Sequence, residues 1–509
     1  MEIKARFVSS MKRAVCLILG FYALTWAWPH QAHPQQAVSI HVDGTVRHQT
    51  IMGFGGSLIP FDLDGVYRAH DPSQPERVVV PPDVRQEIAR VLHTELGISR
   101  ARPAPIGFEP ENDNADPNVF DRSRYFWNFR SLDLRGADMY SHYITLARPF
   151  GLQSWFPSFA IELGDGEAWL RIGGAGHNRF ALNPQLIDEF VEWLLAVAVH
   201  FQEIDLELPY MMIQNEPSFG TGRGVIIQPQ DMAMIVEQLG RRLEQAGLRT
   251  KIVIPDDLNP TNALAYIEAV LNNPAARSFV GALAYHCYDG VYNQPQVILQ
   301  TSAQGNPDHE AVAVRRRIRD LARQYHLPVW MSEISSSRPH DLTPFDVARA
   351  RANHIHDELT IADATAFDLN NLFFIELPNT EADIILVYFN PDGRFNRYQV
   401  TPWGYILGHY ARYARPGSVR IEATSSDPRV RVAAFERPDG GIAVVAINNN
   451  DSPVEVEIRF GGINQIPTGF EVRSSVENRL WQSSPPVEVR DGVLRVTLPP
   501  RSITTLAGA

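Results

Sequence analysis

YMMIQNEP, residues 210–217, and VWMSE, residues 329–333, are the two segments that decide the fold. Each is a short apolar run that ends in a glutamate, Glu216 in the first and Glu333 in the second. Runs of this kind are typical of the buried strands of a parallel sheet. Pro217 favours an end of the first strand at that point. We therefore expect both carboxylates at the C-terminal ends of parallel strands.

Similar apolar runs recur on both sides of these segments and alternate with amphipathic stretches. In residues 83–96, for example, the apolar residues are spaced by three or four, which makes one buried helical stripe. Eight strands, each followed by a helix, predict a (β/α)8 TIM barrel over residues 51–415. The expected strands are 51–59, 98–102, 152–159, 210–214, 251–255, 280–288, 329–333 and 371–377. The expected helices are 83–96, 140–149, 184–201, 228–246, 261–271, 311–325, 344–361 and 402–413.

From residue 416 onward the pattern changes to short alternating strands with Asp-Gly, Gly-Gly and Asn-rich turns. This pattern predicts a C-terminal antiparallel β-sandwich domain over residues 416–509. Residues 38–50 are also strand-like and precede the first barrel strand, so we expect them to join the sandwich. The predicted fold class is therefore α/β, with both chain ends in the smaller domain.

The N-terminal residues 1–37 resemble a secretory signal peptide. Lys12 and Arg13 precede an apolar run from Ala14 to Trp28, and polar sequence follows. A membrane anchor is the alternative, but the run is shorter than the about 20 apolar residues that span a bilayer. We expect cleavage and secretion, either to a periplasm or to the exterior, with no stable insertion into the membrane.

Composition limits the function classes. The chain has 509 residues, 44% hydrophobic and 20% charged, with a net charge of −12. These values are typical of globular domains. The negative charge does not favour binding to nucleic acid, which is itself negatively charged. Cys16 lies in the expected signal, so Cys287 is alone in the remaining chain and no internal disulfide is expected.

The two glutamates suit one chemistry in particular. By strand count, Glu216 and Glu333 end the fourth and seventh strands, across the barrel mouth where active sites collect. In glycoside hydrolysis one carboxyl group protonates the leaving oxygen, and the other attacks the anomeric carbon or activates water. The first must be protonated while the second is ionised. The alternative to a catalytic pair is that both glutamates are ordinary surface residues at strand ends.

Asn-Glu-Pro at 215–217 together with Glu333 resembles the large clan of retaining barrel glycosidases. Three further stretches are similar to glycoside hydrolase family 30. They are QTIMGFGGS at 49–57, LGHY at 407–410 with RPGSVRI at 415–421, and LPPRSITTL at 498–506. The resemblance implies a retaining β-glycosidase that works by double displacement on a carbohydrate. Substrates across that family include xylans, glucuronoxylans, β-1,6-linked glucans and galactans, and glucosylceramide.

The resemblance also implies roles for matched residues. Glu216 would be the general acid/base and Glu333 the nucleophile. Asn215 would hydrogen-bond the sugar 2-hydroxyl, a contact that strengthens in the transition state. Arg102 would lie beside Glu333 and keep it ionised, with Arg100 as the less favoured choice on the same strand face.

Two residues near the end of the sixth strand complete the roles that the resemblance implies. Tyr288 would hydrogen-bond the nucleophile, and His286 would line the pocket. A buried histidine with only a structural role is the alternative for His286.

Three further positions are candidates for binding the sugar. Trp155, which ends the third strand, offers an aromatic platform. Asp257, with Asp256 beside it, ends the fifth strand and is expected to bind sugar hydroxyls. For Trp155, a purely structural place in the core is the alternative.

We expect neither a metal nor a cofactor. The metal-like run HIHDE at 354–358 lies in a predicted helix, where positions i and i+2 do not share a face. The stretch NNLFFIE at 370–376 departs from the family, which commonly has tryptophan there, and an unusual insert follows at 378–396. These departures leave the substrate open. A non-catalytic carbohydrate-binding barrel and an inverting or other-clan glycosidase remain the alternatives.

Overall fold

The computed structural model describes most of the chain after the expected signal peptide. The described residues are 37–58, 80–103, 116, 119, 139–158, 168–172, 181–219, 225–307, 309–375, 380–381, 383–392 and 394–509. The expected signal peptide at 1–37 lies outside these ranges except for its last residue. Within them, no helix has the length and apolar character needed to cross a membrane.

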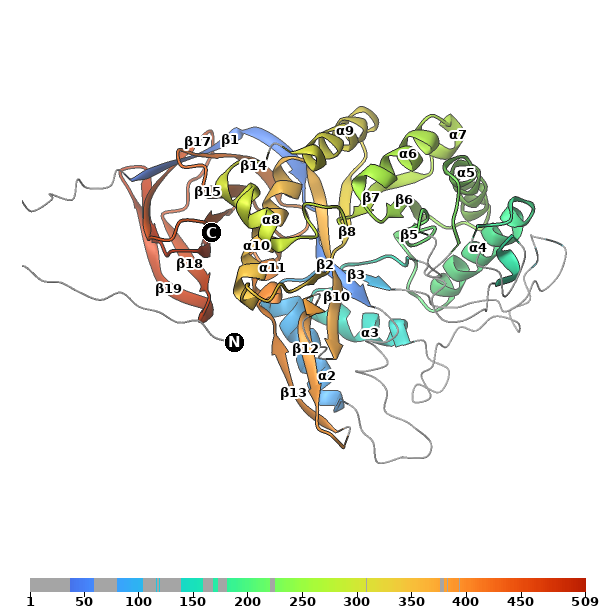
Figure 1. The fold of residues 1–509 in the computed structure, drawn as a ribbon, viewed down its shortest axis with the longest axis horizontal. Helices are drawn as coiled ribbons and strands as arrows, with labels where there is room; N and C mark the ends of the chain where they lie inside the picture. Colours follow the sequence, from blue (N-terminus) through green and yellow to red (C-terminus); the bar gives the residue numbers. More distant parts are fainter. Residues whose placement is uncertain are drawn as a thin grey trace, which may run out of the picture. The chain divides into compact units, whose positions relative to one another are not determined.

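Parallel strands form a nearly closed barrel, which confirms the predicted (β/α)8 fold (Figure 1). Neighbouring strands follow the order β4-β3-β2-β10-β8-β7-β6-β5. The two edges meet where the backbone N–H of Met212 donates to the carbonyl of Pro157 at 2.9 Å. The strands are β2 (Gly53–Leu58), β3 (Arg100–Pro103), β4 (Ser154–Trp155), β5 (Tyr210–Met212), β6 (Lys251–Asp257), β7 (Val280–His286), β8 (Val329–Glu333) and β10 (Ala364–Ile375).

Helices follow the strands and cover the outside of the barrel (Figure 1). Several of them begin with proline at the first helical position, where its missing N–H removes no intrahelical bond. The helices are α2 (Pro82–Arg90) with η1 (Val91–Glu95), α3 (Met139–Ala147) with η2 (Arg148–Phe150), α4 (Ile187–Glu203), α5 (Pro229–Gln245), α6 (Pro260–Leu271), α7 (Pro274–Arg277), α8 (Pro295–Gln300), α9 (Glu310–Tyr325), α10 (Pro344–Thr360) and α11 (Pro402–Ala411).

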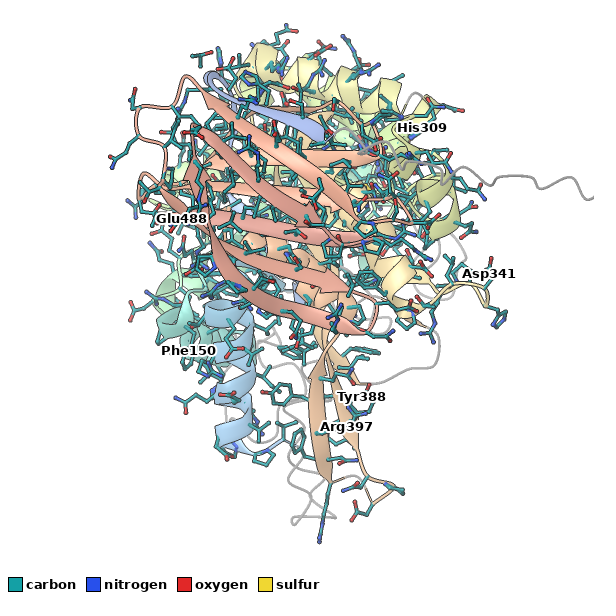
Figure 2. All side chains as sticks on the ribbon, turned by 90° about the vertical axis from the view of Figure 1, so that its left-hand side faces the viewer. Phe150, His309, Asp341, Tyr388, Arg397 and Glu488 are labelled. Carbon is teal, nitrogen blue, oxygen red and sulfur yellow. The ribbon has the colours of Figure 1, made fainter. Side chains whose placement is uncertain are left out.

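The C-terminal strands form a sandwich that closes on itself, and Figure 2 views these strands face-on. The N-terminal strand β1 (Val38–Thr50) takes part: it pairs antiparallel with β14 and parallel with β17. The remaining strands are β14 (Val419–Ser425), β15 (Val430–Glu436), β16 (Ile442–Asn448), β17 (Val454–Gly461), β18 (Gly469–Val476), β19 (Arg479–Arg490), β20 (Val493–Leu498) and β21 (Ser502–Gly508).

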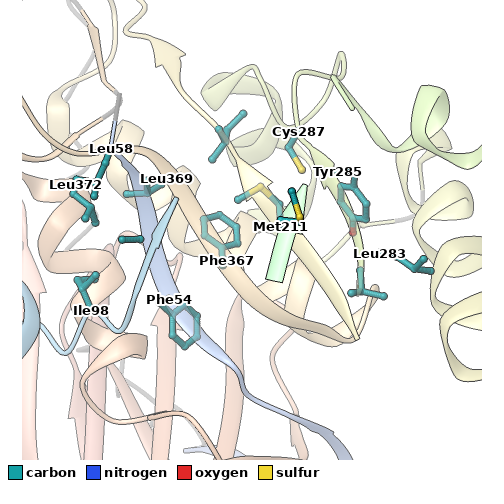
Figure 3. Close-up of a cluster of buried hydrophobic side chains, with 14 of the residues drawn as sticks. Phe54, Leu58, Ile98, Met211, Leu283, Tyr285, Cys287, Phe367, Leu369 and Leu372 are labelled. Carbon is teal, nitrogen blue, oxygen red and sulfur yellow. The ribbon is translucent and has the colours of Figure 1, made fainter. Parts of the chain in front are cut away.

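The barrel has a small inner core and a large outer one. Side chains alternate along each strand, so one set fills the barrel and the other packs under the helices. Phe156, Met212 and Trp330 belong to the inner core. The outer core includes Phe54 and Leu369, which Figure 3 shows on strands β2 and β10. The mouth of the barrel therefore rests on a packed interior rather than on an open channel.

The eighth barrel strand departs from the sequence prediction. It begins at Ala364 instead of residue 371. The polar residue Asp368 lies inside this strand, where its carboxylate accepts a hydrogen bond from Arg100. The predicted insert at 378–396 contains β11 (Thr380–Glu381) and β12 (Asp383–Phe389), and β13 (Phe395–Val400) follows. Strand β12 runs parallel to β10 and turns into β13, so most of the insert extends the sheet.

The LGHY motif lies where α11 meets the sandwich. The ring of His409 is fully buried, with Nδ1 2.8 Å from the hydroxyl of Thr505 and Nε2 2.9 Å from the hydroxyl of Ser475. Burial lowers the pKa of His409 to about 3, so the ring is neutral and joins β18 and β21 to the barrel by uncharged hydrogen bonds.

Candidate active site

Glu216 and Glu333 come together at the C-terminal ends of β5 and β8. One carboxylate oxygen from each, together with a ring nitrogen of His286, forms a group whose atoms all lie within 4.8 Å of one another. The Nδ1 atom of His286 is 3.1 Å from Glu216 Oε1 and 3.9 Å from Glu333 Oε1. Both glutamates are only slightly exposed, so their charges act in a partly dehydrated site.

The backbone at Glu216 is strained. Its φ angle is 49°, in the left-handed region that residues other than glycine rarely adopt. Its N–H donates to the carbonyl of Asp256 at 2.9 Å, and Asp256 itself has a φ of 63°. Two such residues at neighbouring strand ends hold the carboxyl group of Glu216 at the mouth at a conformational cost of about 1 kcal/mol or more each.

Glu333 is held by two donors. Arg102 donates from Nη1 to Oε2 at 2.7 Å, and Tyr288 donates its hydroxyl to Oε1 at 2.8 Å. The guanidinium of Arg102 is almost fully buried, which strengthens its pairing with the carboxylate. The two bonds fix both carboxylate oxygens of Glu333.

Beneath the pair lies Asp256, a fully buried carboxylate. Its Oδ2 accepts from Arg102 at 2.7 Å and from the hydroxyl of Ser158 at 2.5 Å. Its Oδ1 accepts from Ser332 at 2.6 Å and lies 3.1 Å from Nε2 of His286. Burial opposes the charge, but Arg102 and His286 outweigh it and hold the pKa of Asp256 well below its usual range.

His286 is charged in this surrounding. Burial opposes its protonation, but the carboxylates of Glu333 and Asp256 overcome it and raise the pKa of His286 to about 10. The imidazolium therefore donates from Nδ1 toward Glu216 and from Nε2 toward Asp256. Such a histidine is an electrostatic part of the site and not a neutral core residue.

The cluster holds more carboxylates than cations. Three carboxylates, those of Glu216, Glu333 and Asp256, face two cations, Arg102 and His286. Arg102 binds both Glu333 and Asp256, whereas Glu216 has no contact with a guanidinium among the described residues.

The two arginines of β3 have different partners. Arg102 lies beside Glu333, as the resemblance implies. Arg100 pairs with Asp368 at 3.0 Å, and both side chains are fully buried. Its guanidinium lies 4.3 Å from the ring centre of Phe156 and 4.2 Å from that of Trp330. Arg100 therefore belongs to the layer below the mouth.

Asn215 joins the same network. Its Oδ1 accepts from Nη2 of Arg102 at 2.6 Å, which orients the side-chain amide. The described residues give its amide nitrogen no hydrogen-bond partner, so this donor is available to a ligand at the mouth. Its part in binding a sugar hydroxyl remains a prediction.

Trp155 lies away from the glutamates. Its Nε1 donates to the carbonyl of Leu206 at 3.2 Å, and Arg148 covers its ring at 5.6 Å. The next residue, Phe156, points into the barrel, so alternation along the strand turns Trp155 outward. We therefore do not assign Trp155 to the site.

Asp257 forms no hydrogen bond with the two glutamates or with Arg102 and His286 among the described residues. Its side chain is fully buried, and Oδ1 accepts from the hydroxyl of Ser218 at 2.9 Å and from the N–H of Leu258 at 2.8 Å. These bonds hold the loop that follows Glu216. The inward neighbour Asp256 is the residue that sequence reasoning undervalued, although its position at a strand end was the available signal.

The metal-like run in α10 has a different explanation. His354 and Glu358 share a helix face, and with Cys287 they form a group of possible metal ligands. However, Arg315 already occupies this group: its Nε donates to Glu358 at 2.6 Å, and its Nη2 lies 3.0 Å from the sulfur of Cys287. The group is a buried ion-pair network, and Cys287 is a free, buried thiol within it.

Comparison with known proteins gives several independent similarities. Residues 417–506 match the model of the glycosyl hydrolase family 30 beta sandwich domain. The chain is 23% identical to putative glucosylceramidase 2 of Caenorhabditis elegans, over 84% of this chain and 80% of that protein. It is 22% identical to glucuronoxylanase XynC of Bacillus subtilis, over 65% of this chain and 66% of that protein.

Among solved structures, the family 30 subfamily 8 xylanase Xyn30A of Clostridium acetobutylicum is similar with a TM-score of 0.66. The identity is 18%, and the match covers 92% of this chain and 100% of the xylanase. At this identity the match supports the fold, barrel and sandwich together. The sequence relatives and the sandwich model support a glycosidase.

Proposed function

We propose that the chain is a secreted, retaining β-glycosidase of glycoside hydrolase family 30, a proposal supported by its match to that family's sandwich model, by its glycosidase relatives and by its similarity in fold to a family 30 xylanase. Glu216 is the general acid/base and Glu333 the nucleophile. The observation that carries the proposal is the approach of their carboxylate oxygens to within 4.8 Å. Retaining enzymes have carboxyl groups about 5–5.5 Å apart, whereas inverting enzymes need about 6.5–9.5 Å to admit a water.

The first step forms a glycosyl-enzyme. Glu216 gives its proton to the glycosidic oxygen while Glu333 attacks the anomeric carbon, so the leaving group departs as an alcohol. In the second step Glu216 removes a proton from water, and the resulting hydroxide releases the sugar from Glu333. Each carboxyl group returns to its starting state, and no cofactor takes part in either step.

The neighbours serve both steps. Arg102 and Tyr288 fix the two oxygens of Glu333, so attack needs little reorientation. After Glu216 has lost its proton, the imidazolium of His286 stabilises the new carboxylate from 3.1 Å. Asp256 keeps both cations in place from below.

A neutral β-linked glycan is the substrate class that we favour, since the chain has a net charge of −12. Its relatives include a putative glucosylceramidase and a glucuronoxylanase, so xylan, β-1,6-linked glucan or galactan, and glucosylceramide-like substrates are the candidates. The signal-like N-terminus favours action outside the cytoplasm.

The roles are tested with two variants and a control. We expect Glu333→Gln to abolish hydrolysis of an aryl β-glycoside while binding persists. We expect Glu216→Gln to slow substrates with poor leaving groups far more than activated aryl glycosides. Glu310→Gln, an exposed change at the start of α9, should leave both rates unchanged. Equal losses on both substrate types would argue against an acid/base role for Glu216.

A digest of a broad panel of β-glycosides and β-glycans, followed by product analysis, identifies the sugar and the linkage. If wild-type protein binds glycans but hydrolyses none of the panel, the chain is a carbohydrate-binding barrel and the enzymatic proposal fails.

A further inference from the structure

A cavity lies where the floor of the barrel meets the sandwich. Its volume is about 690 Å³, within the range of small-molecule sites. On the barrel side it is lined by Phe150, Arg412 and Arg415, and on the sandwich side by residues that include Glu471. Phe150 ends η2 just before strand β4 begins, so the cavity lies at the N-terminal ends of the strands, opposite the catalytic mouth. Phe150 is labelled in Figure 2.

Two arginines dominate the charge of the barrel side. Arg412 uses Nη1 to donate to the carbonyls of Thr94 and Glu95, at 2.9 and 3.0 Å. Arg415 uses Nη1 to donate to the carbonyl of Gly97 at 3.1 Å. Each guanidinium has five N–H donors, so most donors of both groups are not used in these bonds.

Neither guanidinium forms an ion pair with a carboxylate among the described residues. Burial and the like charge of Arg412 lower the pKa of Arg415, which agrees with a pair of cations that repel each other. A third cavity arginine, Arg437, differs because it pairs with Asp439. The positive charge of Arg412 and Arg415 is therefore available to an anion in the cavity.

The lining also offers an aromatic surface beside these cations. Phe150 is only partly buried and borders the cavity. The carbon face of a sugar packs against such a ring, while guanidinium groups bind carboxylate or phosphate oxygens in paired hydrogen bonds. We propose that the cavity is a second carbohydrate site, remote from the catalytic mouth, that takes an acidic sugar through its carboxylate or phosphate group. The choice of a sugar rests on the proposed function, whereas the anion preference does not.

A purely structural role is the competing explanation. Arg412 and Arg415 follow the end of α11, where basic residues stabilise the helix terminus, and both donate to backbone carbonyls. In that case their replacement changes the melting temperature and leaves ligand binding unaffected. Binding and stability therefore have to be measured on the same variants.

The test is calorimetric titration of the full chain with glucuronic acid, glucose 6-phosphate, glucose and inorganic phosphate. We expect either or both acidic sugars to bind, and glucose to bind at least about tenfold more weakly. The double variant Arg412→Gln/Arg415→Gln should weaken acidic-sugar binding at least about tenfold, because two charge-assisted contacts are lost. Arg490→Gln, which removes an exposed arginine paired with Glu488, is the matched control and should bind like wild type.

Glu471→Gln provides a gain-of-binding test that does not depend on removing an arginine. Glu471 adds negative charge to the cavity, so its neutralisation should tighten binding of the acidic sugar. If the double variant does not fold, Arg415→Gln alone and Glu471→Gln carry the test.

Three results overturn the proposal. If glucose binds as tightly as the acidic sugars, the acidic group is not what the cavity recognises. If inorganic phosphate binds as tightly as both acidic sugars, the cavity is an anion site and not a carbohydrate site. If the double variant binds like wild type, the cavity is not the binding site. Hydrolysis of aryl β-glycosides is measured in parallel and should be unchanged in all these variants. A failure of the catalytic proposal would appear there, independently of the titrations.

Discussion

The replacement Asp256→Asn probes the buried carboxylate that holds the catalytic cations. Asparagine has nearly the same shape as aspartate, so the barrel core keeps its packing. The change removes the charge that faces Arg102 and His286. The new side chain also carries an amide N–H₂ group, which points either toward Arg102 and Ser158 or toward His286 and Ser332. In either orientation this N–H₂ group faces another hydrogen-bond donor.

The magnitude follows from the bonds that are lost. A hydrogen bond to a charged group contributes about 1.5–3 kcal/mol. Losing the charge-assisted contacts on one side of Asp256 therefore removes about 3 kcal/mol of the interaction free energy that holds Arg102 or His286 in position. If that positioning acts in the transition state, kcat falls about 100-fold, since about 1.4 kcal/mol corresponds to tenfold. Folding is less affected, because the other side still accepts hydrogen bonds.

The pH dependence gives a second readout. His286 has a raised pKa of about 10, so its charge is present below that value and lost as the pH rises through it. Asp256 is one of the carboxylates that raise this pKa. In Asp256→Asn the charge is lost at lower pH, and the alkaline limb of the kcat profile should move toward neutrality.

The assay is the kcat profile of an aryl β-glycoside between pH 5 and 10, with Asp257→Asn as the matched control. Asp257 is equally buried but contacts Ser218 and Leu258 instead of the cations. We expect the control to lose less than about tenfold and to keep its alkaline limb. The reasoning is refuted if Asp256→Asn stays within about threefold of wild type, or if both variants behave alike.

Three further predictions concern other contacts. Tyr288→Phe should lower kcat/KM by about 10–100-fold through loss of its hydrogen bond to the nucleophile; an unchanged value contradicts the role. Asp368→Ala should lower the unfolding free energy in urea by about 3–5 kcal/mol, because Arg100 is left buried without its partner; a loss below about 1 kcal/mol would oppose this. Burial opposes the charge of Glu358, but Arg315 lowers its pKa to about 2. Stability should therefore fall as acid titration passes from about pH 4.5 toward 2, and less steeply in Glu358→Gln.

The barrel and the sandwich were predictable because their signals are local. Apolar runs of strand length, helical spacing between them and turn residues all recur along the chain. The glutamates could be placed at the mouth from strand order alone. The early start of the eighth strand was not predicted, because Asp368 resembles a loop residue in the sequence and its buried partner Arg100 comes from a strand far away in the sequence.

The network beneath the glutamates was less accessible to sequence reasoning. Whether Trp155 and Asp257 face the barrel interior depends on the alternation of side chains at the strand ends. A bulge or a left-handed residue shifts that alternation, so it changes which side chain faces inward. The register shifts between Pro255 and Asp257, and Asp256 has a positive φ, so the inward position passes to Asp256. Such local irregularities carry no clear pattern in a single sequence.

The stereochemistry of hydrolysis tests the central claim most directly. Wild-type protein is mixed with a β-glycoside in an NMR tube, and the first-formed anomer is recorded before mutarotation mixes the signals. Double displacement through Glu333 predicts that the β-anomer appears first and the α-anomer grows in later. An α-anomer formed first would mean inversion, and it would remove Glu333 as the nucleophile.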